Sequence, residues 1–355
     1  MSSDRVVVVG GGPGGIEAAR GVAGLGLEVT IVEKLERLGG TPISENYAAL
    51  TPNFEDAEAA MDRMIEAMLA LPGVDVRTSS TVSACEGESG DFKVTISGAA
   101  GDETIDAGAV ILATGFQHFD PGRETQMYGY YEHPDVIALQ DLEAMLKDHN
   151  VVRPSNGEAP KRVCFVQCVG SRDRHIGNEY CSKVCCGVAS KEAIEIRKLL
   201  PDCKVFIFYI DMRMYGYWEN QIYWPAQEEH HVQYVKGIIT EVLKKDGRLL
   251  VRGEDTTMGR PMEVLMDLVV LSVGMEPSRG TREMAGVLGI QQNKYGFIEA
   301  ANPPLDTVTT SREGIYACGA ALGPADLEDT ISSAGAAAMK AVSLLRSGKT
   351  AAASS

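Results

Sequence analysis

Residues 5–15 read RVVVVGGGPGG, and this stretch decides the fold. Its β-branched run at 5–9 predicts a buried parallel strand. Three of its glycines, Gly10, Gly12 and Gly15, have the spacing G-x-G-x-x-G. The first permits a tight turn, the second lets backbone N–H groups approach a pyrophosphate, and the third lets a helix pack closely on the strand. The stretch therefore predicts a strand followed by a phosphate-binding turn.

The residues after this turn complete a βαβ unit. A helical pattern covers 16–25, and a second strand, EVTIVE at 28–33, ends in Glu33. Pro13 and Gly14 lie at the expected start of the helix, whose N-terminus favours negative phosphates. Glu33 lies where an acid accepts a hydrogen bond from a ribose hydroxyl. Together these features predict a dinucleotide site in an α/β fold.

Composition excludes several other classes of protein. The 355 residues include 33 basic and 49 acidic side chains, for a net charge of −16, which argues against a nucleic-acid surface. No apolar run reaches the roughly 18–20 residues that a membrane helix needs, so we expect no transmembrane segment. The first residues lack a signal-peptide pattern, and we predict a cytoplasmic protein. Its eight cysteines are then metal ligands, catalytic thiols or core residues rather than structural disulfides.

Three further stretches extend the first unit. They read EKLERLGGT (33–41), AGAVILATGF (107–116) and TSREGIYACGAA (310–321). The trio resembles the flavoproteins with two dinucleotide-binding domains, a class that includes thioredoxin reductase and glutathione reductase. This resemblance implies an α/β fold of two Rossmann-like domains, with FAD in the first and the second inserted into it.

The resemblance also implies which residues contact FAD. Lys34 would touch its adenosine end, and backbone groups of Val82 would contact adenine. The implied set is Gly10, Gly12, Pro13, Gly14, Gly15, Glu33, Lys34, Gly39, Gly40, Thr41, Val82, Ala113, Thr114, Gly115, Gly319, Ala320 and Asp326.

One position departs from the family pattern. The family has Asp directly after the late glycine, whereas here Ala320 follows Gly319. Either backbone groups take over the contact with the ribityl chain, or one of the next carboxylates does: Asp326, Glu328 or Asp329.

A second βαβ pattern lies in the middle of the chain. Strands are predicted at 161–167 and 204–210, with a helix at 182–200 between them and Asp211 after the second strand. The glycines of its first loop, Gly170, Gly177 and Gly187, have the wrong spacing for a phosphate. We therefore predict that this slot does not bind NAD(P)H. The predicted segments are 1–150 and 286–346 for the FAD domain, 151–285 for the inserted domain, and 347–355 for a disordered tail.

The loop of the second unit reads CVGSRDRHIGNEYCSKVCC (168–186) and is dense in thiols. A redox disulfide is disfavoured, because no C-x-x-C occurs in the chain and the stretch after Gly-Gly-Thr has no cysteine. Zinc needs paired cysteines, which Cys164-x3-Cys168 and Cys181-x3-Cys185 nearly supply. Unligated core thiols are a third reading, which we prefer for Cys85, Cys164, Cys203 and Cys318.

An iron–sulfur cluster is the favoured interpretation, because such a cluster needs four converging thiolates and this stretch supplies four cysteines. Cys181 and Cys185 are four residues apart, the spacing of one helical turn. Cys186 follows directly, and Cys168 ends the preceding strand. Two interpretations remain for Arg172 and Arg174 in the same loop: they offset the negative charge of a cluster or phosphate, or they belong to a solvated loop.

The stretch at 167–193 resembles the signature of the A subunit of heterodisulfide reductase, and so do 209–230 and 323–338. The resemblance implies FAD in the first domain and a [4Fe–4S] cluster in the second, with Cys168, Cys181, Cys185 and Cys186 as ligands. It also implies electron transfer within a complex with HdrB-like and HdrC-like subunits, and no independent substrate site or catalytic residue.

The chain resembles the short form of this protein, because it lacks a C-x2-C-x2-C-x3-C run. Short forms belong to the heterodisulfide-reductase-like complex of sulfur oxidisers, which the length favours, or to a quinone-interacting oxidoreductase of sulfate reducers. A stand-alone NAD(P)H-dependent flavin reductase with a structural zinc is the alternative. Aromatic stretches at 127–134 and 214–225 are read as core or as a partner or homodimer surface.

Overall fold

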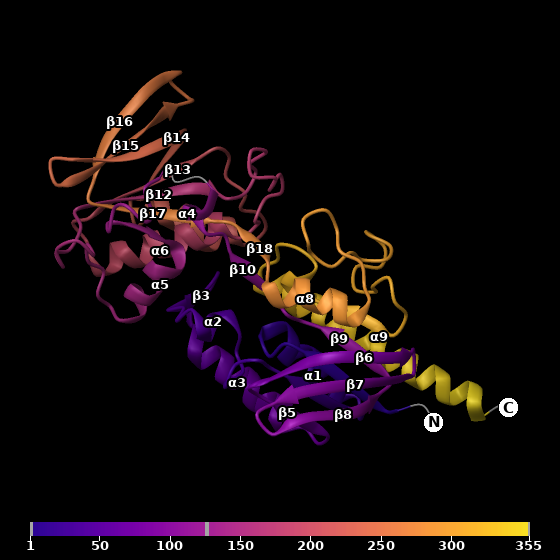
Figure 1. The fold of residues 1–355 in the computed structure, drawn as a ribbon. Helices are drawn as coiled ribbons and strands as arrows, with labels where there is room; N and C mark the ends of the chain where they lie inside the picture. The colour runs from indigo at the N-terminus through magenta and orange to yellow at the C-terminus, as the bar shows by residue number, and fades with distance from the viewer. Residues whose placement is uncertain (1–2, 125–127, 354–355) are drawn as a thin grey trace. The chain divides into compact units, whose positions relative to one another are not determined.

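The computed structural model describes residues 3–124 and 128–353 and divides the chain into two compact units (Figure 1). Unit 1 comprises Met1–Ser44, Glu58–Gln117 and Glu276–Ser355, and unit 2 comprises Glu45–Ala57 and His118–Met275. Each unit is an α/β assembly around its own sheet, which is parallel in unit 1 and mixed in unit 2. Within the described residues, no helix is both long and apolar enough to cross a membrane.

The sheet of unit 1 has the order β19-β9-β1-β2-β5, and its neighbouring strands run parallel. Chain order reverses between β1 and β9, which makes the carboxyl edge at this point the usual place for a ligand. The strands are β1 (Arg5–Val9), β2 (Glu28–Val32), β5 (Val74–Arg77), β9 (Ala109–Leu112) and β19 (Ile315–Ala317).

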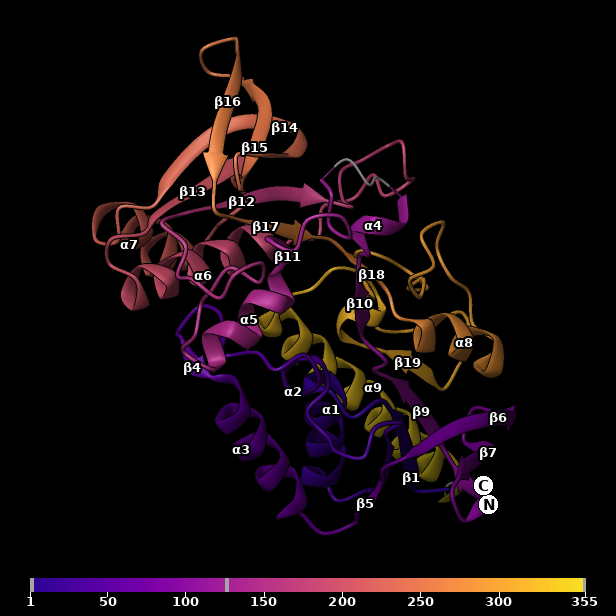
Figure 2. The ribbon, with the colours of Figure 1, turned by 60° about the vertical axis from the view of Figure 1, so that its left-hand side comes forward.

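Helices and a small sheet complete unit 1. Helix α1 (Pro13–Gly24) packs along α9 (Leu327–Ala353), and their small and branched side chains share one core with β1 and β2 (Figure 2). A second core joins the sheet to α8 (Arg279–Leu288) and to an antiparallel sheet. That sheet contains β6 (Ser80–Glu88), β7 (Asp91–Gly98) and β8 (Gly101–Ala107). Helix α3 (Ala57–Leu69) lies between β4 and β5 in the chain.

The sheet of unit 2 has the order β11-β17-β12-β13-β14-β15-β16. The pairs from β11 to β14 are parallel, and β15 and β16 continue the sheet as antiparallel strands. Helices α5 (Leu139–Lys147) and α6 (Cys185–Leu199) share a core with one face, and Phe119 packs on the other. The strands are β11 (Val136–Ala138), β12 (Arg162–Val169), β13 (Lys204–Tyr209), β14 (Gln233–Lys245), β15 (Arg248–Asp255), β16 (Arg260–Met266) and β17 (Leu268–Val273).

Short elements fill the connections. They are α2 (Thr41–Ser44), β3 (Ala49–Leu50), β4 (Glu55–Asp56), β10 (Phe116–His118), α4 (Pro121–Glu124), η1 (Glu219–Tyr223), α7 (Trp224–Glu228), β18 (Met275–Pro277) and η2 (Gly319–Ala321).

The observed divisions differ from the predicted boundaries in four places. Residues 276–285, predicted to end the inserted domain, lie in unit 1. Residues 118–150 lie in unit 2, because β11 pairs with β17. Residues 45–57 also lie in unit 2, although the sequence places them in the FAD domain. Helix α9 continues to Ala353, so 347–353 is helical rather than the expected disordered tail, and 354–355 lie outside the described residues.

Candidate functional site

The predicted FAD residues of unit 1 gather at the carboxyl ends of four parallel strands. Gly10 follows β1, Glu33 follows β2, Ala113 follows β9, and Cys318 leads from β19 to Gly319. Because β19, β9, β1 and β2 are neighbours in this order, these positions share one edge of the sheet. This edge includes the reversal of chain order, where open α/β sheets bind their ligands.

Close backbone contacts explain why the turn after β1 needs glycine. A Cβ atom on Gly15 would collide with the carbonyl oxygen of Gly10. Gly10 has a φ of +110°, and a Cβ there would collide with the carbonyl of Ala113. The turn thus lies directly against the end of β9, and a side chain at either position would force the two apart.

A second glycine pair brings the Gly-Gly-Thr segment onto this turn. A Cβ on Gly40 would lie 2.6 Å from the Cα of Gly12, and Gly40 has a φ of +60°. The N–H of Gly39 donates to the carbonyl of Gly11, and Thr41 begins α2. Gly12 precedes Pro13 and Gly14 of α1, where no side chain caps the helix, so its first N–H groups are suited to a phosphate.

The carboxylate of Glu33 is held by backbone groups. Its two oxygens accept from the N–H of Gly11 at 2.6 Å and from the N–H of Leu35 at 2.8 Å, and the side chain is buried. The glycine turn and the end of β2 are therefore fixed to each other by this acid. Lys34 beside it is exposed. The side chain of Val82 is buried in the core of unit 1, so only its backbone is available to a ligand.

Three hydroxyl groups fix the end of β9, and the sequence does not predict two of them. The hydroxyls of Thr114 and Thr281 lie 2.7 Å apart, and Thr281 also donates to the carbonyl of Gly115 at 3.0 Å. Ser278 donates to the carbonyl of Thr114 at 2.9 Å and caps α8. The sequence signal for Ser278 is its place before a helical pattern, but its partner is 164 residues away.

At the late strand, Gly319 begins η2 with a φ of +61° and donates its N–H to the hydroxyl of Ser333. Ala320 is buried beside it. Asp326 precedes α9, and its carboxylate accepts from the N–H of Asp329 at 2.7 Å. Asp326, one of the three carboxylates considered as a replacement for the family Asp, therefore already accepts a hydrogen bond at the start of α9.

In unit 2, four thiols come together where β12 ends and α6 begins. Cys168 is the penultimate residue of β12, and Cys185 and Cys186 are the first residues of α6. Burial, reinforced by the nearby thiol of Cys186 and then that of Cys181, raises the pKa of Cys168 to about 11. A hydrogen bond with Cys186 raises the pKa of Cys185, and the nearby thiols of Cys168 and Cys181 raise it further. The same hydrogen bond lowers the pKa of Cys186 to about 7.

The route of Cys181 differs from the expected one. Helix α6 begins at Cys185 rather than at residue 182, and Lys183 has a φ of +65°. A left-handed residue cannot lie within a right-handed helical turn. Cys181 therefore reaches the other thiols from a loop, in which its Sγ accepts from the N–H of Lys183 at 3.3 Å.

The donor set fits an iron–sulfur cluster better than a single ion. Within 3–124 and 128–353, no three His, Cys, Asp or Glu side chains are arranged to hold one metal ion. A cluster is larger than an ion, so its ligands stand farther apart, and four soft thiolates are its usual ligands. The thiols here are close enough to shift one another's pKa.

Cys164 lies apart from this group. It is completely buried with Val166 and Val269 in the core on one face of the sheet, whereas Cys185 and Cys186 belong to the core on the other face. Burial raises the pKa of Cys164 strongly, with no contribution from another thiol. Cys85, Cys203 and Cys318 are also buried, each in an apolar setting.

Two glycines, Gly170 in the cysteine loop and Gly187 in the first turn of α6, serve side-chain packing. A Cβ on Gly170 would collide with the ring of Phe119, and one on Gly187 would collide with the indole of Trp218. Aromatic rings thus approach the backbone where a nucleotide-binding loop presents glycine amides to phosphate.

Unit 2 also buries a group of charged residues that the sequence does not predict. The ammonium of Lys191 donates to the carboxylate of Glu143 at 2.5 Å and to the carbonyl of Ala49 at 3.0 Å. Glu192 is completely buried, and burial raises the pKa of its carboxyl well above the usual range. A Lys-Glu pair on a predicted helix normally indicates a solvated face, so the sequence offers no signal.

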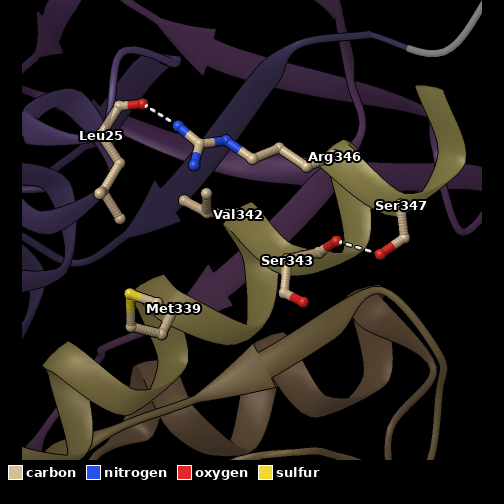
Figure 3. Close-up of a pocket in the computed structure, with 6 residues that line it drawn as sticks. All are labelled: Leu25, Met339, Val342, Ser343, Arg346 and Ser347. Carbon is tan, nitrogen blue, oxygen red and sulfur yellow. Dashed lines mark hydrogen bonds between the residues drawn. The ribbon is translucent and has the colours of Figure 1, made fainter. Parts of the chain in front are cut away.

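A hollow of about 290 Å³ lies beside α9 (Figure 3). It is lined by Leu25 and by the second half of α9, where Arg346 donates to the carbonyl of Leu25 at 2.7 Å. None of the predicted ligands borders it.

Comparisons with known proteins agree with this geometry. Residues 4–341 match the family model of pyridine nucleotide-disulphide oxidoreductases. Thioredoxin reductases of T. acidophilum and Lactococcus lactis superpose with TM-scores of 0.63 and 0.64, each at 18% identity and over 97% of this chain and 98% and 99% of theirs. The predicted thioredoxin-reductase-like fold is therefore confirmed.

Curated relatives confirm the second resemblance. The chain is 39% identical over 68% of its length to the A subunit of the H(2):CoB-CoM heterodisulfide,ferredoxin reductase of Methanothermobacter thermautotrophicus, covering 38% of that protein. It is 31% identical over 98% of its length to an iron-sulfur A subunit of the CoB--CoM heterodisulfide reductase of Methanopyrus kandleri, covering 65%. The chain thus spans about two fifths to two thirds of these two relatives. It belongs to the pyridine nucleotide-disulphide oxidoreductase family, as a flavoprotein oxidoreductase similar to the A subunits of heterodisulfide reductases.

Proposed function

We propose that the chain carries FAD in unit 1 and a [4Fe–4S] cluster in unit 2, and transfers electrons within a heterodisulfide-reductase-type complex. The four-thiol group at the start of α6 carries this proposal, because it stands where a nicotinamide-binding enzyme has its phosphate loop. When bound, the flavin would exchange two electrons and the cluster one, so the pair would link two-electron and one-electron partners.

The residues of this chain would hold the two groups in different ways. In unit 1, the backbone of the glycine turn would bind the pyrophosphate, and Glu33 would accept from the ribose. In unit 2, Cys168, Cys181, Cys185 and Cys186 would bind iron. Burial of Cys185 and Cys186 beside apolar side chains would limit contact with water.

The test is the composition of the protein purified without oxygen. We expect FAD, together with equal amounts of iron and acid-labile sulfide, and an absorption beyond the flavin bands that bleaches with dithionite. Zinc in place of iron, with a flavin-only spectrum and NAD(P)H oxidation, would refute the proposal in favour of a stand-alone flavin reductase. The matched variant Cys203→Ala should retain the iron that Cys186→Ala loses.

We further propose that the chain forms a homodimer and assembles with HdrB-like and HdrC-like subunits. We also propose a cytoplasmic location, because free thiols persist in a reducing compartment. Cytoplasmic sulfur oxidation is the proposed pathway. Affinity purification of the tagged chain from its own host tests this assignment: recovery of B- and C-like subunits supports it, and recovery of a quinone-interacting membrane protein would support the sulfate-reducer pathway. Tyr217, Tyr215 and Trp224 are exposed and are available as contacts, while the 127–134 stretch is described only from residue 128 onward.

A further inference from the structure

Arg172 connects the cysteine loop to the end of the next strand. Its guanidinium donates to both carboxylate oxygens of Asp211, at 2.5 and 3.0 Å. The same Nη1 atom lies 3.9 Å from the Sγ of Cys168, within hydrogen-bond range for sulfur. The side chain is 18% exposed, so the guanidinium lies largely out of water. Two parallel N–H···O bonds fix the plane of a guanidinium, and here they direct it at a thiol.

Asp211 has a different partner from the one that its position in the fold suggests. It follows β13, the second strand of the βαβ unit, where a nucleotide-binding domain places the acid for the ribose. Here the carboxylate is shared between Arg172 and Arg213, whose Nε lies 3.3 Å from Oδ1. Although burial opposes the change, hydrogen bonds from these two arginines lower the pKa of Asp211. The acid is thus ionised and holds a cation against the cysteine loop.

Other N–H groups around the thiols reinforce this arrangement. The backbone N–H of Lys183 donates to Cys181, and the backbone N–H of Arg213 donates to Cys186. Arg213 therefore contributes twice, with its side chain to Asp211 and with its backbone to a thiol. Donors from two separate loops converge on the sulfurs.

We propose that Arg172, oriented by Asp211, is a positioning residue that raises the reduction potential of the cluster on these cysteines. The inference rests on the proposed function, since it takes the four thiols as the cluster ligands. One-electron reduction adds one negative charge to the cluster and its thiolates. A guanidinium and an N–H···S bond stabilise the more negative state, so the potential is higher with Arg172 than without it.

The experiment is an anaerobic potentiometric titration of the whole chain with dithionite as reductant and ferricyanide as oxidant, followed by electron paramagnetic resonance. Arg172→Gln removes the positive charge and the paired N–H donors of the guanidinium, and we expect the midpoint potential of the cluster to become more negative. Arg174→Gln is the matched control, because Arg174 lies in the same loop but is 90% exposed and pairs with Glu179. Its midpoint should equal that of the unmodified chain. An unchanged midpoint in Arg172→Gln would overturn the inference.

A second variant separates orientation from charge. Asp211→Asn removes a negative charge, which on charge alone raises the potential. If Asp211 positions the guanidinium, its loss releases Arg172 from Cys168 and the midpoint falls. A fall supports the proposal, and a rise or no change refutes the role of Asp211.

Arg172→Lys retains the positive charge but cannot make the two parallel hydrogen bonds of a guanidinium. It replaces Arg172→Gln if that variant does not fold. A midpoint below that of the unmodified chain supports the inference, and an equal midpoint overturns it.

The unmodified chain distinguishes failure of the proposed function from failure of this inference. If it contains no iron and sulfide, the proposed function fails and this inference falls with it. If it contains the cluster and its midpoint does not respond to Arg172 or Asp211, only the inference fails.

Discussion

The first loops of the two βαβ units differ in what fills them. In unit 1, backbone atoms surround the loop after β1: a Cβ on Gly15 would collide with Gly10, and a Cβ on Gly10 would collide with Ala113. In unit 2, the loop after β12 is filled by side chains, with thiols, Arg172 and the rings of Phe119 and Trp218 around it. In both units the strand before the loop pairs in parallel with the strand after the helix, so the two loops occupy the same place in a βαβ unit.

The two acids at the ends of the second strands make the same contrast. Glu33 accepts from backbone N–H groups of the glycine turn, whereas Asp211 accepts from two guanidinium groups. A common fold position thus supports a loop that leaves amides available in one unit and a loop that orients a cation in the other. Similar topology does not imply the same ligand, because the ligand is selected by the atoms at the loop.

The largest expected effect comes from Gly15→Ala in the loop of unit 1. The added Cβ collides with the carbonyl of Gly10, so we expect a loss of about 3 kcal/mol in stability and loss of bound FAD. Gly335→Ala in α9 is the matched control, because nothing lies within 4 Å of its added Cβ. Thermal unfolding and flavin content measure both variants. A Gly15→Ala protein with normal FAD content would show that the turn does not bind the dinucleotide.

The next effect separates the thiols of unit 2. Cys186→Ala should lose its iron while keeping FAD, because the two groups would be held by different units. Cys164→Ala should keep both, because Cys164 faces the opposite side of the sheet. Iron, sulfide and flavin analyses of the purified variants measure this. Loss of iron from Cys164→Ala would mean that the ligand set is wrong.

A smaller effect compares the two acids. Glu33→Gln removes a charged acceptor at the glycine turn, and we expect FAD affinity to fall about 10- to 100-fold. Asp211→Asn should leave FAD affinity unchanged, because Asp211 contacts only arginines among the described hydrogen bonds of its side chain. Titration of the apoprotein with FAD gives both constants. Equal losses in the two variants would contradict the assignment of FAD to unit 1.

The last effect is seen only in acid and concerns the stability of unit 2. Burial lowers the pKa of His118 to about 4, from an ordinary value near 6.5. The folded-state pKa is depressed, so this histidine contributes stability above pH 6.5 that is lost as the pH falls toward 4, by about 3 kcal/mol at most. The stability difference between the unmodified chain and His118→Gln should therefore shrink between pH 7 and pH 4.5. His175→Gln, at a side chain 97% exposed, should show a constant difference in denaturant unfolding. A constant difference for His118→Gln would contradict the burial argument.

Local spacing predicts the parts of the site that are local in the chain. The turn from Gly10 to Gly15 and the acid Glu33 fall within one βαβ unit, so their relation depends on backbone geometry that residue type already restricts. The predicted start of α6 is wrong by three residues, because the left-handed turn at Lys183 has no glycine to reveal it.

Local spacing does not predict ion pairs between residues that are far apart in the sequence. Arg172 and Asp211 are 39 residues apart, and Lys191 and Glu143 are 48 apart, and each pair forms only because the sheet brings distant loops together. The assignment of residues 45–57 to unit 2 has the same origin. A charged residue in a helical pattern does not show whether it faces water or a buried partner.

The buried ammonium of Lys191 has a consequence for the order in which the chain folds. It donates to the carbonyl of Ala49, 142 residues earlier, and Glu143 accepts from the N–H of Ala48. During synthesis, the segment 45–57 leaves the ribosome long before either anchor exists. This segment, which contains β3 and β4, can therefore make these contacts of unit 2 only after α6 has been synthesised.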